Sequence, residues 1–176
     1  MKKEFSKFIF SENNDNLSNV LIKELVKRKE SLAFAESCTG GLLSSSITAI
    51  SGSSKVFKGS IISYSDELKQ SLLNVPENII QKYGAVSAEV AKTMAINTKE
   101  KLNTDWSIAI SGIAGPSGGS TEKPIGLVHI AIAGPNDQIT NIKKRFGTTR
   151  NRLEIQRLSV NVCLNSLRLI LLSSSK

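Results

Sequence analysis

Apolar residues follow two patterns along the chain: a repeat of three or four residues, typical of helices, and short unbroken runs, typical of buried strands. The helical repeat predicts long helices at about residues 17–30, 66–75, 87–102 and 150–172. The unbroken runs "SLAFAES", "KVFKGSIISYS" and "DWSIAISGIAG" predict strands. Two shorter helices are predicted at "TGGLLSSSITAI" and "PENIIQKYG". Helices and strands therefore alternate.

The segment "IGLVHIAIAGPNDQITNIKKRF" predicts two strands joined by a turn at residues 134–137, and hence an antiparallel hairpin. Strands that alternate with helices and then form a hairpin predict a single-domain α/β fold, a three-layer α/β/α sandwich around a mixed sheet. We expect this domain to cover residues 18–172, after a polar N-terminal extension at 1–17 and before a frayed tail at 173–176.

Composition places the chain of 176 residues among globular proteins, with 40% apolar and 22% charged residues. The net charge of +8 favours anionic partners such as a nucleotide, a nucleic acid or another phosphate compound. The densest basic stretch, "KKRFGTTRNRLEIQR", lacks the interleaved aromatic residues of a base-stacking surface. We therefore favour a solvated basic face over a nucleic-acid partner.

The N-terminal residues lack the apolar core and cleavage site of a secretory signal, and no apolar run approaches the ~18 residues of a membrane span. These features predict a cytoplasmic protein with no membrane partner. The two cysteines, Cys38 and Cys163, have no CxxC partner, so no metal site is expected.

The stretch "AESCTGGL" lies at a predicted strand-to-helix junction, where backbone N–H groups can stabilise an oxyanion or bind a phosphate. Ser37 is the candidate nucleophile, and Thr39, Gly40 and Gly41 are candidate substrate-binding residues, the two glycines because they would allow close approach of a ligand. The alternative is that Ser37 or Thr39 only caps the helix. The spacing fits neither a P-loop nor GxGxxG. Cys38 is a rival nucleophile that would need a base.

A serine nucleophile also needs a base, and the single histidine, His129, lies inside a predicted strand. Lysine is the usual substitute, and Lys69 in "YSDELK" is the candidate. Tyr64, at the end of a predicted strand, could orient the lysine or relay a proton. The alternative is an exposed helical lysine and a packed tyrosine.

A third cluster, "SGIAGPSGG", follows another strand and supplies Ser111, Gly112 and Gly115 as candidate ligand-binding residues. Arg150, before the last helix, is a candidate clamp for a phosphate, with a solvent-facing arginine as the alternative. Ligands of open α/β sheets bind beyond the carboxyl ends of strands. The strand ends near Ser37, Tyr64 and Ser111 therefore predict one shared site.

Four motifs in order, "AESCTGGLLSSSIT", "GSIISYSDELKQSLLNV", "GAVSAEVA" and "SGIAGPSGGSTEKPIGLVHIA", resemble the C-terminal domain of the competence-damage-inducible CinA family over about residues 18–172. Within that family the chain resembles the stand-alone nicotinamide-nucleotide amidases. The resemblance implies hydrolysis of the carboxamide of nicotinamide mononucleotide to nicotinic acid mononucleotide and ammonia, in pyridine-nucleotide recycling, without a metal or organic cofactor.

The resemblance also implies site roles: Ser37 as the nucleophile, Lys69 as its base, and Tyr64 and Arg150 as matching motif residues. One departure is visible, because family members often carry Asn where this chain has Asp66. The family is commonly oligomeric, which implies a homodimer.

Two alternatives remain open at this point. The first is a non-catalytic module that binds nucleotide or nucleic acid and is linked to competence or DNA damage, as the +8 charge would suit. The second is an amidase for a different pyridine or nucleotide amide.

Overall fold

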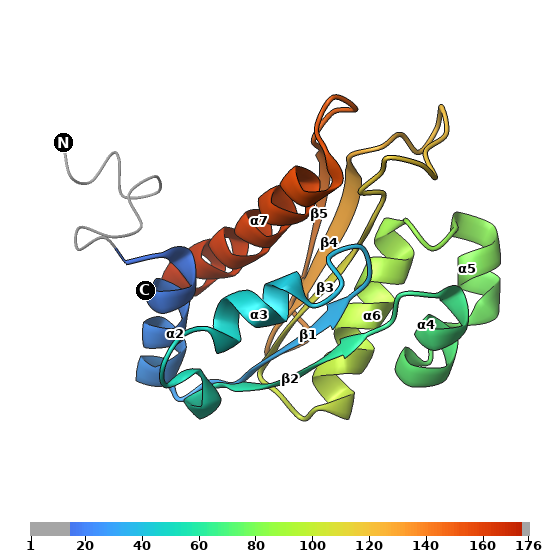
Figure 1. The fold of residues 1–176 in the computed structure, drawn as a ribbon. Coiled ribbons are helices and arrows are strands. Elements are labelled where there is room, and N and C mark those ends of the chain that lie inside the picture. The colour runs from blue at the N-terminus through green and yellow to red at the C-terminus, as the bar shows by residue number, and fades with distance from the viewer. Residues whose placement is uncertain (1–14, 174–176) are drawn as a thin grey trace.

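A five-stranded sheet forms the centre of the computed structural model, which describes residues 15–173 (Figure 1). The strands lie in the order β2-β1-β3-β4-β5. The first three are mutually parallel, whereas β4 and β5 form the predicted antiparallel hairpin, so the prediction of a mixed sheet is confirmed. The strand bounds are β1 Leu32–Glu36, β2 Phe57–Ile62, β3 Trp106–Gly112, β4 Leu127–Ala133 and β5 Ile139–Arg145.

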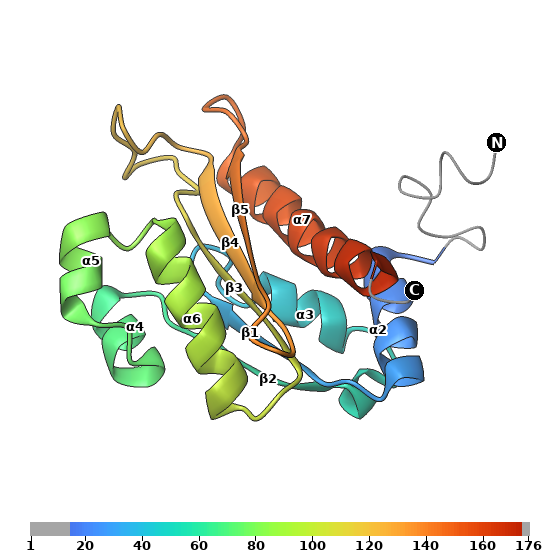
Figure 2. The same cartoon turned by 180° about the vertical axis from the view of Figure 1, so that it is seen from behind.

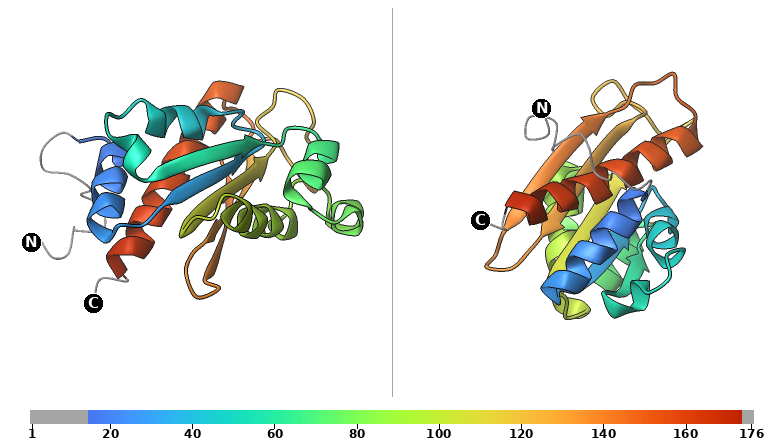
Figure 3. Two further views of the ribbon diagram at one scale, coloured as in Figure 1. Left: turned by 90° about the horizontal axis from the view of Figure 1, so that it is seen from below. Right: turned by 90° about the vertical axis from the view of Figure 1, so that its left-hand side faces the viewer.

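Helices cover both faces of this sheet, as the views in Figures 1, 2 and 3 agree. Helices α2, α3 and α7 lie on one face, while α6 packs on the other face and carries α4 and α5 on its outer side. The predicted three-layer α/β/α sandwich is therefore confirmed. The helix bounds are α2 Leu17–Arg28, α3 Leu42–Thr48, α4 Asp66–Leu73, α5 Glu77–Tyr83, α6 Ala88–Lys101 and α7 Arg152–Ser173, with a 3-10 turn η1 at Ser53–Lys55.

The domain limits predicted at 18–172 stay a prediction. Of the predicted N-terminal extension, residues 1–14 lie outside the described residues, as do residues 174–176 of the predicted tail. Helix α2 begins within the predicted extension, at Leu17, where the side chain of Asn16 accepts a hydrogen bond from the N–H of Asn19 and so caps the helix.

Helix α7 begins at Arg152, two residues later than the sequence predicted. Its buried side carries Ile155, Ser159, Cys163 and Leu167, whereas Leu153 in its first turn is exposed. By length and composition α7 could cross a membrane, the one such helix among residues 15–173. Here it packs against α2, α3 and β4 as a core helix of the domain.

The junction between β1 and α3 is held by a fully buried carboxylate, that of Glu36 at the end of β1. Its Oε2 accepts hydrogen bonds from the N–H groups of Gly41 and Leu43, at 3.0 and 3.1 Å. Its Oε1 accepts from the N–H of Ser44, at 2.8 Å, and from the Ser44 hydroxyl. The negative charge thus lies at the positive end of the helix dipole and satisfies amide groups that would otherwise lack partners.

Glu36→Ala should lower the free energy of unfolding by about 3 to 5 kcal/mol, because it leaves several buried donors without an acceptor. Chemical denaturation measures this difference. Glu77→Ala, which removes an exposed carboxylate from the first turn of α5, is the matched control and should change stability by about 0.5 kcal/mol or less. Equal effects of the two substitutions would contradict a structural role for the Glu36 carboxylate.

Candidate active site

A cavity of about 240 Å³ opens beyond the carboxyl ends of the three parallel strands. Ser37 reaches it from the end of β1, Tyr64 from the segment after β2, and Ser111 from β3. The structure thus brings together the three strand ends that the sequence placed at one site. Six of the predicted site residues line the cavity, namely Ser37, Tyr64, Lys69, Ser111, Gly112 and Gly115.

Ser37 lies directly after β1 and is 7% exposed. Its backbone N–H donates to the carbonyl of Ile110 on β3, at 3.1 Å, which continues the strand pairing by one residue. Its hydroxyl has no hydrogen-bond partner among residues 15–173, and Ser37 lines the cavity. The backbone next to it is fixed from the other side, because the Gln156 side chain of α7 donates to the carbonyl of Cys38, at 2.8 Å. The serine is therefore held rigidly while its hydroxyl stays available.

The amide groups at the start of α3, which the sequence analysis expected at an oxyanion or phosphate, are already occupied. Those of Gly41, Leu43 and Ser44 donate to the Glu36 carboxylate. The amides of residues 40 and 42 donate to the carbonyls of residues 37 and 39. Within the described residues, the N–H groups of Cys38 and Thr39 donate to no other residue. Of these two residues, Cys38 lines the cavity and Thr39 does not, so an oxyanion in the cavity would meet the N–H group of Cys38 rather than the amides of the helix.

Gly40 and Gly41 lie outside the cavity lining, contrary to the expectation that they allow a ligand to approach. Their backbones have φ angles of 58° and 102°, a region that residues with a side chain rarely adopt. A Cβ on Gly41 would also lie 3.2 Å from the Cδ1 of Ile62. Both glycines are needed for the turn that lets α3 fold back over Glu36.

Thr39 also lies outside the cavity lining. Its buried hydroxyl has no hydrogen-bond partner in the described part of the chain. Gly41 occupies the N-cap position of α3, and the side chain that accepts from the first amides of this helix is that of Glu36. The alternative that Ser37 or Thr39 is a helix cap is therefore excluded.

Lys69 is one of the largest fully buried side chains of the domain, with 1% of its surface exposed. Its Nζ donates to the backbone carbonyls of Tyr64 and Ser65, at 3.2 and 3.3 Å, and lies 3.4 Å from the Oδ1 of Asp66. The side chain thus folds back over the N-terminus of α4 and lines the cavity with Ser37. The alternative of an exposed helical lysine is excluded.

Tyr64 is 56% exposed, so it is not a packed core residue. Its hydroxyl accepts a hydrogen bond from Nη2 of Arg152, at 2.7 Å, rather than contacting Lys69. Nη1 of the same arginine donates to the carbonyl of Gly115, at 3.0 Å. One guanidinium group therefore links the segment after β2 to the loop after β3.

Arg150, the predicted phosphate clamp, does not line the cavity. Its exposed guanidinium donates to the carbonyl of Phe146 in the segment before α7. Arg152, two residues further along the chain, lines the cavity instead of Arg150. The sequence held a usable signal, because residue 152 is three residues before Ile155 and seven before Ser159, and so lies on the buried side of α7.

The β3–β4 loop supplies the remaining wall. The Ser111 hydroxyl donates to the carbonyl of Ala85, at 2.7 Å, which fixes the segment before α6 against β3. Gly115 has a φ of 74°, and a Cβ there would lie 2.8 Å from the Cγ2 of Ile125. Only glycine fits this turn without displacing Ile125.

Cys38 lines the cavity beside Ser37, but its thiol is poorly suited to be a nucleophile. Burial raises the pKa of this thiol to about 12, although its own backbone N–H and the charge of Arg152 act in the opposite direction. The thiol is therefore protonated at neutral pH, and the thiolate is the reactive form. Within residues 15–173 no group of three or more His, Cys, Asp or Glu side chains could hold a metal ion.

The sequence model of the CinA C-terminal domain matches residues 14–171. The chain belongs to the CinA C-terminal domain family. A CinA-like protein of Prochlorococcus marinus subsp. pastoris is 81% identical over 176 residues, which is all of this chain but 41% of that protein. A CinA-like protein of Synechococcus sp. is 49% identical and matches 91% of this chain and 38% of its own length. The chain thus spans about two fifths of the length of these curated relatives.

Solved structures of CinA proteins share this fold. The competence/damage inducible protein CihA of Agrobacterium tumefaciens has a TM-score of 0.86 and 34% identity, with 93% of this chain and 98% of that chain covered. A CinA superfamily protein of Escherichia coli has a TM-score of 0.82 and 30% identity, with 94% and 98% covered. The α/β architecture described above is therefore that of the CinA family.

Neither cysteine should react readily with Ellman's reagent in the native protein at pH 8. Burial raises the pKa of both thiols, so almost no thiolate is present, and both side chains are shielded. In guanidinium chloride both thiols should react at once. Rapid labelling of one thiol in the native protein would contradict this result and restore Cys38 as a candidate nucleophile.

Proposed function

We propose that this chain is an amidohydrolase that converts nicotinamide mononucleotide to nicotinic acid mononucleotide and ammonia. The observation that carries the proposal is the presence, in one cavity, of an unpartnered Ser37 hydroxyl and the fully buried amine of Lys69. A serine and a lysine together can perform acyl transfer without a histidine. The family resemblance supplies the substrate class.

In the proposed mechanism, the amine of Lys69 accepts the proton of the Ser37 hydroxyl as the hydroxyl oxygen attacks the carboxamide carbon. The tetrahedral intermediate collapses to an acyl ester on Ser37, and the leaving nitrogen takes the proton back from Lys69 to depart as ammonia. A water molecule, deprotonated by Lys69, then attacks the ester carbonyl; the bond to the Ser37 oxygen breaks, that oxygen takes the proton from Lys69, and the carboxylic acid is released. The serine and the lysine end each cycle unchanged.

The oxyanion of the intermediate would be stabilised by the backbone N–H group of Cys38, which lines the cavity beside Ser37. This N–H group donates to no other described residue, whereas Glu36 has bound the amides at the start of α3. Donors fixed in position before the reaction stabilise developing charge without reorganisation. The hydrogen bond from Gln156 to the carbonyl of Cys38 supports this arrangement.

The cavity of about 240 Å³ suits a pyridine carboxamide better than an entire nucleotide, so the ribose phosphate would lie toward its open side. We propose Arg152, rather than Arg150, as the cation that faces the nucleotide, because Arg152 lines the cavity. The cytoplasmic location, expected from the N-terminal sequence, and the homodimer, implied by the family resemblance, belong to the same proposal.

Ser37→Ala and Lys69→Met should each lower the rate of ammonia release from nicotinamide mononucleotide about 10³-fold or more, because each removes a member of a unit that acts together. The assay is ammonia release by purified protein. Free nicotinamide, which lacks the ribose phosphate, is the control substrate and should be hydrolysed poorly.

Binding of the nucleotide to the Ser37→Ala protein, followed by calorimetry, distinguishes loss of chemistry from loss of the folded site. Retained binding with no turnover would support the assigned roles. No ammonia release above the Ser37→Ala background by the wild-type protein would overturn the proposal. Salt-dependent binding of polynucleotide that is unaffected by Ser37→Ala would then favour the non-catalytic alternative, which the net charge of +8 permits.

Asp66→Asn, which restores the residue common in the family, should raise kcat/KM two- to fivefold. The Asp66 carboxylate is an ion-pair partner of Lys69, 3.4 Å from its Nζ, and its removal takes away a contact that holds the amine at the N-terminus of α4. Steady-state kinetics with nicotinamide mononucleotide measure the change.

Glu67→Gln is the matched control for this change. It also removes one carboxylate from the first turn of α4, but Asp66 and not Glu67 forms the ion pair with Lys69. Its kcat/KM should stay close to that of the wild-type protein. An equal rise of kcat/KM in both variants would show a general effect of surface charge and would contradict a role for the Asp66 ion pair.

A further inference from the structure

We propose that a second cavity, on the face of the sheet that carries α6, binds the phosphate group of a small molecule. This cavity has a volume of about 410 Å³ and is larger than the one that contains Ser37. Its walls come from the first turn of α6, the loop before β4, and strands β4 and β5. The proposal concerns binding and does not depend on the amidase activity.

The floor of this second cavity belongs to a cross-strand row of polar side chains. Ser111 on β3 lies opposite His129 on β4, and His129 lies opposite Lys143 on β5. Side chains directly opposite one another on paired strands share a face of the sheet. His129 and Lys143 line the second cavity, and Ser111 lines the first.

His129 carries the argument because its side chain is largely buried, 9% exposed, and forms no hydrogen bond with another described residue. Its ring nitrogens are not among the fully buried polar atoms that lack a partner, so they remain accessible. Because His129 lines the second cavity, a bound molecule can reach these nitrogens. The imidazole therefore offers the cavity a polar group that no other described residue uses.

The charges that surround the imidazole determine the chemical class of that ligand. Burial is the largest cause that lowers the pKa of the His129 imidazole. The positive charges of Lys143, on β5, and Lys123, in the loop before β4, lower this pKa further, whereas Glu89 of α6 raises it weakly. Glu122 also lines the cavity, at its loop side. The cavity lining holds two lysines and two glutamates, and the cation of Lys143 lies directly opposite His129 on the paired strand, so the part of the floor at the imidazole favours an anion.

A phosphate group fits the donors that meet there. The amine of Lys143, the amide of Asn141 and an N–H of His129 can each donate to one of its oxygens, and all three residues line the cavity. The first turn of the fourteen-residue helix α6 adds the positive end of its dipole at Ala88 and Glu89. A tetrahedral dianion can use donors that come from these several directions at once.

A single short segment separates the two cavities, since Val86 lines both. In this segment the backbone carbonyl of Ala85 accepts a hydrogen bond from the hydroxyl of Ser111, which lines the first cavity. The backbone carbonyl of Tyr83 accepts one from the amine of Lys123, which lines the second cavity. A phosphate bound beside Lys123 would therefore lie against the segment that forms one wall of the candidate active site.

The test is a titration of inorganic phosphate at fixed pH, followed by the imidazole signals in the proton NMR spectrum. The chain has one histidine, so these signals report on His129 alone. Phosphate should shift them, and should raise the pKa of His129 because a neighbouring anion favours the charged imidazolium. No shift of the imidazole signals at saturating phosphate would overturn the proposal.

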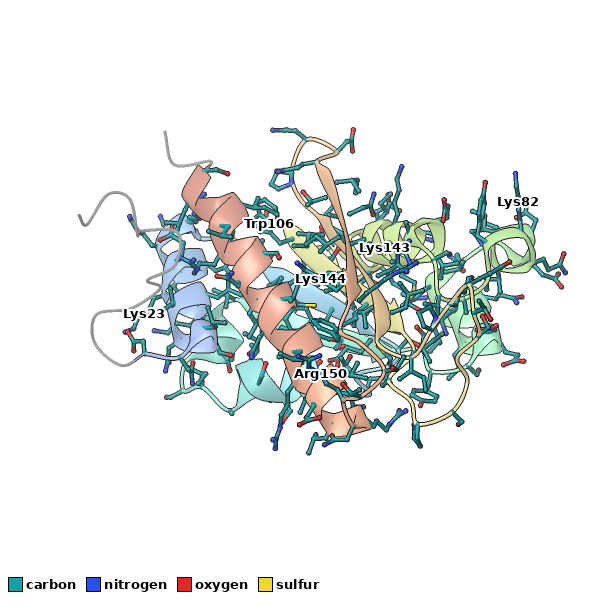
Figure 4. All side chains as sticks on the ribbon, turned by 90° about the horizontal axis from the view of Figure 1, so that it is seen from above. Lys23, Lys82, Trp106, Lys143, Lys144 and Arg150 are labelled. Atoms are coloured by element: carbon teal, nitrogen blue, oxygen red, sulfur yellow. The ribbon has the colours of Figure 1, made fainter. Side chains whose placement is uncertain are left out.

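Lys143→Gln should weaken phosphate binding about tenfold, because it removes a charged donor from the cavity. Lys144→Gln is the matched control: it makes the same change one residue along β5, where the side chain points to the opposite face (Figure 4). Its affinity should stay within about twofold of the wild-type value. Equal weakening by both variants would show a general effect of charge and would overturn the site.

The phosphate could belong to a separate molecule or to the nucleotide substrate itself. Titrating phosphate into the Ser37→Ala protein saturated with nicotinamide mononucleotide distinguishes these sources. Unchanged shifts of the His129 signals would show a separate site. Loss of the phosphate response, with the His129 signals already shifted by the nucleotide, would assign the cavity to the phosphate of the substrate. Loss of the response with no shift caused by the nucleotide would overturn the proposal.

Discussion

The hydrogen bonds from the amides of α3 to the buried Glu36 carboxylate are the interaction on which the candidate site depends. A carboxylate removed from water is stable only when its oxygens accept several hydrogen bonds, and here the backbone supplies most of them. The requirement forces the chain to turn sharply at residues 37–41, through two glycines with positive φ angles. Ser37 is the first residue of that turn, so its position follows from the hydrogen bonds that the neighbouring Glu36 carboxylate accepts.

Helix α7 provides the second constraint, from the opposite side of the cavity. Arg152 and Gln156, one turn apart, donate to the backbone after β1 and β3 and to the side chain of Tyr64 after β2. Segments that are distant in sequence are thereby held at fixed separations. A substitution on α7 can therefore alter the cavity without contact with a substrate.

Burial affects the reactivity of the ionisable side chains in and near the two cavities. Desolvation raises the pKa of the Cys38 thiol and lowers that of the His129 imidazole, so it suppresses the charge of both. Lys69 is equally buried, but two backbone carbonyls and Asp66 lie within hydrogen-bonding reach of its amine. The serine and lysine are thus the pair in the cavity with a free hydroxyl and a potential base, while the cysteine beside them stays inert.

The sequence by itself determined the order of elements, the mixed sheet and the strand ends that meet at the cavity, because these follow from local periodicity and from the geometry of parallel strands. It also singled out Ser37 and Lys69. Only the tertiary structure decided which groups meet. The amides of α3 donate to Glu36, Arg152 rather than Arg150 lines the cavity, and His129 lies opposite Lys143. These choices depend on contacts between residues far apart in the chain, which no local pattern records.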